Sequence, residues 1–170
     1  MDPARGLLSI ALDLTAALTA SDRYERLLEV VRRSIPCDAA SIMKVQADGL
    51  VILAAHGLVP EALGHRYSRH ENPRLDVILG SLEPVRFTAD SSLPDPFDGL
   101  IAGDEEADLR VHACLGCPLH ASGDVVGVLT ADAFDPHAFD EVDQDFLAML
   151  GALAGAALRT SALIESLESS

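Results

Sequence analysis

The sequence contains no tryptophan and only five phenylalanines and two tyrosines. Its core must therefore be built mainly from aliphatic side chains, and 49% of the residues are hydrophobic. Basic residues are also scarce, with 12 lysines and arginines against 27 aspartates and glutamates and a net charge of −15. A domain that neutralises phosphates should be basic. We therefore expect neither direct nucleic-acid binding nor docking on an anionic membrane.

Long hydrophobic runs are missing as well. The longest apolar stretch covers residues 146–158, which is shorter than the roughly 18 residues that a spanning helix needs. No basic start followed by an apolar run marks a secretion signal, and three cysteines, an odd number, argue against a disulfide framework. These features predict a cytoplasmic protein, and a length of 170 residues suits one domain.

The first third of the chain predicts helices followed by a β-hairpin. Apolar residues recur at helical spacing twice within 1–35. Two short β-type segments follow at 39–45 and 50–55, with a turn at 47–49 between them, because its Asp48-Gly49 pair is typical of a tight hairpin turn.

The remaining elements predict an α+β fold. Pro73 starts a short helix, 85–87 is a short strand, and 111–120 and 124–131 form a second hairpin. A long helix over 140–168 closes the chain. Helices segregated from an antiparallel sheet define the α+β class. We expect so long a helix, rich in alanine and glycine, to act as a dimer contact or a signalling connector.

Four side chains could converge on a metal ion. Asp95 and Asp98 lie three residues apart in a loop that two prolines restrain. Cys114 lies in the first strand of the second hairpin and Asp132 follows the second, so the two should lie opposite or diagonal to each other. Carboxylates with one thiolate disfavour Mg²⁺ and Ca²⁺ and admit iron or zinc. Structural zinc sites prefer several cysteines or histidines, which leaves iron as the best candidate.

Other assignments of these residues stay open at this point. Aspartates in such a loop also form turns and caps, and a free cysteine is commonly just a buried small side chain. His112 is the rival ligand, because it shares a strand face with Cys114. Cys114 and Cys117 form a C-x-x-C pair, but on a strand they point to opposite faces, which disfavours a redox function.

Arg74, at the start of the short helix, has three possible roles. It is a surface ion-pair partner, a charge partner of Asp98 or Asp132 beside the metal, or an unusual and labile ligand.

Several stretches together resemble a known family. They are NPRL at 72–75, VRF at 85–87, LPDPFDGL at 93–100, VHACLG at 111–116 and LTAD at 129–132. In these stretches the chain is similar to the N-terminal GAF domains of bacterial nitric-oxide-responsive regulators of nitric oxide reductase genes. The resemblance covers essentially the whole chain and implies a GAF-like fold, with a central antiparallel sheet, N-terminal helices and a long C-terminal helix.

The resemblance also implies a function. Such domains carry a mononuclear non-haem Fe(2+) centre that binds nitric oxide, and they are not enzymes. Nitric oxide then releases an ATPase domain of the same polypeptide, and transcription follows, so ATP and DNA binding belong to the full-length protein. The positions that match the family's proposed ligands are Arg74, Asp95, Asp98, Cys114 and Asp132.

The expected organisation is one GAF sensor domain over 1–170, with downstream ATPase and DNA-binding domains outside this chain. Helices occupy 1–35, the sheet and site loops 38–132, and the connector or dimer helix 140–168. A homodimer through the helices is a further expectation. The alternatives are a GAF domain that binds a small organic ligand and a GAF-type methionine sulfoxide reductase, because one fold hosts many functions.

Overall fold

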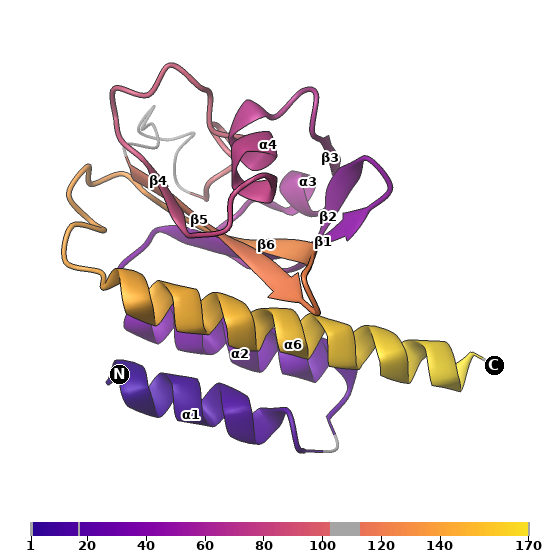
Figure 1. Cartoon of the computed structure of the whole chain (residues 1–170). Coiled ribbons are helices and arrows are strands. Elements are labelled where there is room, and N and C mark those ends of the chain that lie inside the picture. Colours follow the sequence, from indigo (N-terminus) through magenta and orange to yellow (C-terminus); the bar gives the residue numbers. More distant parts are fainter. Residues whose placement is uncertain (1, 17, 103–112, 170) are drawn as a thin grey trace.

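A computed structural model describes residues 2–16, 18–102 and 113–169 (Figure 1). The elements in chain order are α1 (Pro3–Asp13), α2 (Ala20–Ser34), β1 (Ala39–Gln46), β2 (Gly49–His56), α3 (Pro60–Leu63), β3 (Arg66–Ser68), α4 (Pro73–Leu79), β4 (Val85–Phe87), β5 (Ala113–Ala121), β6 (Asp124–Ala133) and α6 (Gln144–Glu168).

The strands form one six-stranded sheet in the order β3-β2-β1-β6-β5-β4, and every neighbouring pair is antiparallel. Helices α2 and α6 cover one face, with α1 packed on their outer side, and α3, α4 and the connecting loops lie over the other face (Figure 1). This arrangement confirms the expected α+β fold, with a central antiparallel sheet between helical layers.

Each face of the sheet has its own hydrophobic core. The helix-side core includes Val31, Ile42 and Leu147, and the site-side core includes Met43, Leu75 and Phe97. Side chains alternate between these two cores along β5. Cys117 is therefore in the helix-side core and Cys114 in the site-side core, which confirms that the two thiols point to opposite faces.

The sequence missed two short elements, α3 and β3, and extended one predicted turn by one residue. The loop between β1 and β2 consists of Ala47 and Asp48, because Gly49 already pairs with Gln46. A Cβ at Gly49 would lie 2.7 Å from the Tyr67 carbonyl oxygen. The glycine therefore permits the close approach of β3, rather than forming the centre of the turn.

The long helix was predicted from residue 140 but begins at Gln144. The Asp143 carboxylate accepts a hydrogen bond from the Asp145 backbone N–H at 3.0 Å, which is the bond of an N-cap. Asp143 therefore ends the preceding turns and starts α6 at the next residue.

By length and composition alone α6 could cross a membrane, because an 18-residue window within it has a mean hydropathy of 1.6. In the fold, however, α6 packs against β5. A Cβ at Gly155 would lie 2.2 Å from the carbonyl oxygen of His120, and one at Gly151 would lie 3.2 Å from that of Pro118. Glycine at both positions lets the helix axis approach the strand closely, so α6 is a core helix of the domain.

Candidate metal centre

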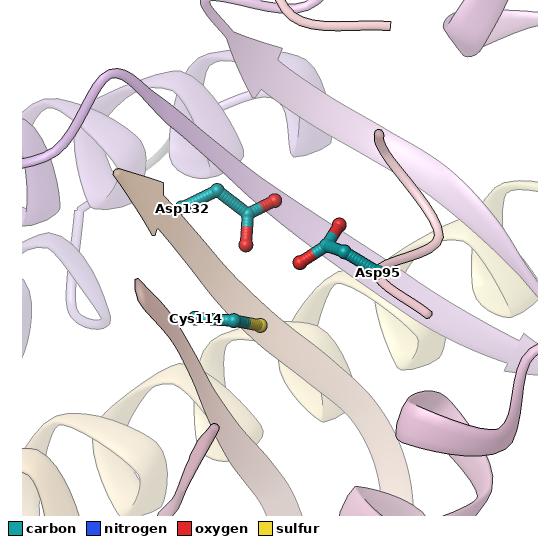
Figure 2. Close-up of side chains that lie close together, drawn as sticks. All are labelled: Asp95, Cys114 and Asp132. Atoms are coloured by element: carbon teal, nitrogen blue, oxygen red, sulfur yellow. The ribbon is translucent and has the colours of Figure 1, made fainter. Parts of the chain in front are cut away.

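Three potential metal ligands from three segments meet in the site-side core. Figure 2 shows Asp95 from the loop after β4, Cys114 from β5 and Asp132 from β6 with their side chains close together. One donor atom from each lies within 4.8 Å of the others. The residues are only 6%, 3% and 1% exposed, respectively. This is the one such group among the residues that the structure describes.

The hairpin register places Cys114 beside Asp132. The turn between β5 and β6 is Ser122-Gly123, with φ angles of 53° and 84°, and such positive values suit the tight hairpin turns that match strand twist. Pairing then runs from this turn, through an irregularity after Leu119, to Cys114 directly opposite Asp132. The predicted proximity of the two side chains is thus confirmed.

Hydrogen bonds to both carboxylate oxygens of Asp95 hold its loop in place. Oδ1 accepts from the Phe97 backbone N–H at 2.8 Å, and Oδ2 accepts from Arg74 Nη1 at 3.2 Å. Arg74 Nε also donates to the Leu93 carbonyl oxygen at 2.8 Å. Phe97 is 1% exposed and packs edge-on against Tyr67, with 5.3 Å between ring centroids. These contacts fix the orientation of the Asp95 carboxylate.

The buried carboxylates and thiol are strongly perturbed. Burial, followed by the negative charge of Asp95, raises the pKa of the Asp132 carboxyl well above its usual value, and Arg74 opposes this shift. Burial also raises the pKa of the Cys114 thiol, and the charges of Asp132 and Asp95 add to the effect. Asp132 Oδ1 has no hydrogen-bond partner within the described part of the chain. A buried oxygen left without a partner is costly.

A divalent cation would offset the crowded negative charge and the unpartnered carboxylate oxygen. With both carboxylates and the thiol ionised, the group carries three formal negative charges, and Arg74 supplies one positive charge. Two further positive charges neutralise the site. A cation would also give Asp132 Oδ1 a partner. The residues therefore fit a divalent metal, and two carboxylates with one thiolate suit ferrous iron better than Mg²⁺ or Ca²⁺.

The other predicted site residues lie around or outside this group of three donors. The Arg74 side chain is 7% exposed and forms an ion pair with Asp95, and its charge also opposes the rise in the pKa of Asp132. The expected pairing of Arg74 with Asp98 stays a prediction. Asp98 is exposed and outside the converging group, and its backbone N–H donates to the Asp95 carbonyl oxygen at 3.3 Å. Its role as a ligand stays a prediction. The rival ligand His112 lies outside the described residues.

Sequence reasoning missed two aromatic residues of the site. Phe97 anchors the loop, and Phe87 lies under the Arg74 guanidinium, with Cζ 4.9 Å from the ring centroid. The available signal was alternation in the short strand 85–87. Phe87 pairs with Cys114, so its side chain shares the face of the thiol.

The fold and the matched sequence define the class of protein. The GAF domain pattern matches residues 19–158, and the chain belongs to the GAF domain family. The solved GAF domain of an Acinetobacter phosphoenolpyruvate-protein phosphotransferase superposes with a TM-score of 0.75 at 21% identity, over 95% of each chain. At this identity the likeness shows the fold alone.

A relative with much higher identity is a transcription regulator. The anaerobic nitric oxide reductase transcription regulator NorR of Serratia proteamaculans is 42% identical over 164 residues, which is 96% of this chain and 32% of that protein. This chain therefore spans about a third of the relative's length and corresponds to its GAF domain.

The reductase alternative finds support only in the fold. Free methionine-R-sulfoxide reductase from Neisseria meningitidis has a TM-score of 0.71 but 16% identity, over 95% of this chain and 91% of that chain. The relatives above 40% identity are transcription regulators, which agrees with the expectation of a sensor domain rather than an enzyme.

Proposed function

We propose that this chain senses nitric oxide through a mononuclear non-haem ferrous ion held by Asp95, Cys114 and Asp132. The observation that carries the proposal is the convergence of these three buried donors, with Asp132 Oδ1 lacking a partner in the described structure. The chain is also 42% identical to a transcription regulator of nitric oxide reductase. This relationship favours nitric oxide as the molecule that binds at such a site. When bound there, ferrous iron supplies a coordination position at which nitric oxide, a neutral ligand, binds.

The residues around the three donors have supporting roles in this proposal. Arg74 neutralises Asp95 and ties it to the loop through Leu93. We assign Arg74 to this supporting role, because a guanidinium stays protonated and has no lone pair to offer a metal. The site-side core, including Phe97, keeps bulk water from the donors. Asp98 is proposed as a further ligand, in the same loop as Asp95.

The proposal extends to the longer protein that the relatives represent. There the domain regulates an attached ATPase domain and thereby transcription in the cytoplasm, and the DNA contacts belong to another part of the polypeptide. Helix α6 is the proposed connector, because it packs closely on β5, the strand that carries Cys114.

We also propose that two copies associate through their helices. Leu8 and Leu12 on α1 are 58% and 60% exposed, and Leu163 on α6 is 58% exposed. Sedimentation should give the mass of a dimer that Leu8→Ser with Leu12→Ser converts to a monomer. A monomer at all concentrations of the unsubstituted chain would exclude this part.

Anaerobic reconstitution with ferrous iron, followed by nitric oxide and electron paramagnetic resonance, tests the sensing function. We expect about one iron per chain and a nitric-oxide-dependent high-spin signal. Cys114→Ala and Asp132→Ala should abolish the signal. Cys117→Ala is the matched control, because its thiol is on the opposite face of the same strand, and it should keep the signal. A signal unchanged in Cys114→Ala would refute the proposed ligands.

A further inference from the structure

Phe87 lies beside the candidate metal centre but carries no ligating atom. It ends β4, the outermost strand next to β5, and its Cα partner is Cys114. Paired residues on adjacent antiparallel strands project to the same face, so the ring and the thiol are neighbours. Phe87 is 9% exposed and belongs to the site-side core.

The ring of Phe87 is a platform for the Arg74 guanidinium. Arg74 Cζ lies 4.9 Å from the ring centroid, within the roughly 6 Å at which a cation and an aromatic face attract each other. The other contacts of the guanidinium are the Leu93 carbonyl and the Asp95 carboxylate. Three segments thus determine its position: the edge strand, the loop backbone and the loop carboxylate.

The position of the Phe87 ring affects the orientation of the Asp95 carboxylate, because Arg74 contacts both. The carboxylate is bonded at both oxygens, to Phe97 N–H on one side and to Arg74 on the other. If the ring were removed, the guanidinium could turn away, and Oδ2 would lose its fixed donor. We infer that Phe87 is a positioning residue of the metal centre, which acts through Arg74 on the Asp95 carboxylate. This inference rests on the proposed function, because it takes Asp95 to be a ligand.

Anaerobic titration of the chain with cobalt(II) alone tests the inference without nitric oxide. Cobalt bound by a thiolate gives a charge-transfer absorption, which reports both occupancy and geometry. Phe87→Leu keeps an apolar side chain but removes the aromatic face. It should weaken cobalt binding about tenfold, as expected for the loss of a buried cation–π contact, and shift the absorption. Phe87→Tyr keeps the ring and should bind cobalt like the unsubstituted chain.

A control separates positioning from general loss of core packing. Phe146, 5% exposed in the helix-side core, is buried to a similar extent. Phe146→Leu should lower the free energy of unfolding and leave the cobalt affinity and spectrum unchanged. Equal effects of Phe146→Leu and Phe87→Leu on cobalt binding would overturn the inference.

A double-mutant cycle tests whether Phe87 acts through Arg74. Arg74→Met keeps a long side chain but removes the cation. We expect Arg74→Met with Phe87→Leu to bind cobalt as weakly as Arg74→Met alone, because the ring then has no cation to position. Effects that multiply would overturn the inference.

The same titration distinguishes failure of the inference from failure of the proposed function. If the unsubstituted chain gives no thiolate-to-cobalt absorption, the proposed metal centre is wrong and the role of Phe87 falls with it. If the unsubstituted chain binds cobalt through its thiolate and Phe87→Leu does so equally well, only the role of Phe87 is refuted.

Discussion

Cys114 and Asp132 face each other across β5 and β6, and both side chains enter the site-side core. Their backbones are fixed by sheet pairing, so the two donors need no loop to bring them together. The third donor, Asp95, comes from a loop that Arg74 and Phe97 hold in place. The candidate centre thus combines two donors positioned by sheet pairing with one donor positioned by the contacts of a loop.

Replacing Asp132 by asparagine should stabilise the metal-free domain. The carboxyl is 1% exposed, its Oδ1 lacks a partner in the described chain, and Asp95 repels its charge. We expect Asp132→Asn to raise the free energy of unfolding at pH 8 by about 1–3 kcal/mol. Urea denaturation measures this change. The variant should also lose the stabilisation that ferrous iron gives the unsubstituted domain. A destabilised metal-free variant would contradict the view that the buried Asp132 carboxylate destabilises the metal-free domain.

The stability of the metal-free domain should fall as pH rises above about 4. The folded state raises the pKa of Asp132, so the folded chain holds this proton where the unfolded chain, with a pKa near 3.9, has lost it. Unfolding then releases a proton, and stability decreases by at most about 1.4 kcal/mol per pH unit until the folded-state pKa is passed.

Denaturation at pH 5 and pH 8 checks this dependence, with Asp132→Asn as the control that should show a smaller slope. Iron affinity should change in the opposite direction, because the donors must lose their protons to bind a cation. A metal-free domain that becomes more stable between pH 5 and pH 8 would contradict the account.

The thiol of Cys37 should react slowly although it is only half-buried. Burial, followed by the charges of Asp38 and Asp132, raises its pKa to about 11. At pH 8 its thiolate fraction is then roughly a hundredfold below that of an ordinary cysteine. Iodoacetamide labelling with mass spectrometry should show slow modification of the folded chain and rapid modification in urea. Equal rates in the two conditions would show that the thiol is not perturbed.

The close packing of α6 on β5 should make Gly155 intolerant of a methyl group. An added Cβ would meet the His120 carbonyl oxygen at 2.2 Å, whereas one at Gly151 would meet that of Pro118 at 3.2 Å. Alanine favours a helix by about 1 kcal/mol over glycine, but overpacking costs about 1–3 kcal/mol. We expect Gly155→Ala to lower the unfolding free energy and Gly151→Ala to have a smaller effect. Calorimetry measures both, and the reverse order would argue against this packing.

Much of the fold follows from local pattern, and the rest depends on tertiary contacts. Alternation and turn residues located the second hairpin, and its register placed Cys114 opposite Asp132. The strand 85–87 was also found. By contrast, α3 is a single four-residue turn, and β3 contains only one apolar residue, Tyr67, so neither segment produces a recognisable pattern. The start of α6 depended on which of several acidic residues is the cap, and Asp143 alone has that geometry.

The candidate site divides in the same way. The positions of two candidate donors, Cys114 and Asp132, follow from the pairing of the strands. The pairing of Arg74 with Asp95 depends instead on the path of an irregular loop. Nothing in the spacing from Arg74 to Asp95 or Asp98 favours one aspartate over the other. In the structure Asp95 is buried beside Phe97, whereas Asp98 is exposed.

X-ray absorption at the iron edge of the anaerobically reconstituted domain tests the central claim most directly. The account predicts about one iron per chain, with one sulfur neighbour among oxygen neighbours. The sulfur should disappear in Cys114→Ala and remain in Cys117→Ala. Iron surrounded only by oxygen and nitrogen in the unsubstituted domain, or no stoichiometric iron, would contradict the proposal that Asp95, Cys114 and Asp132 form the metal centre.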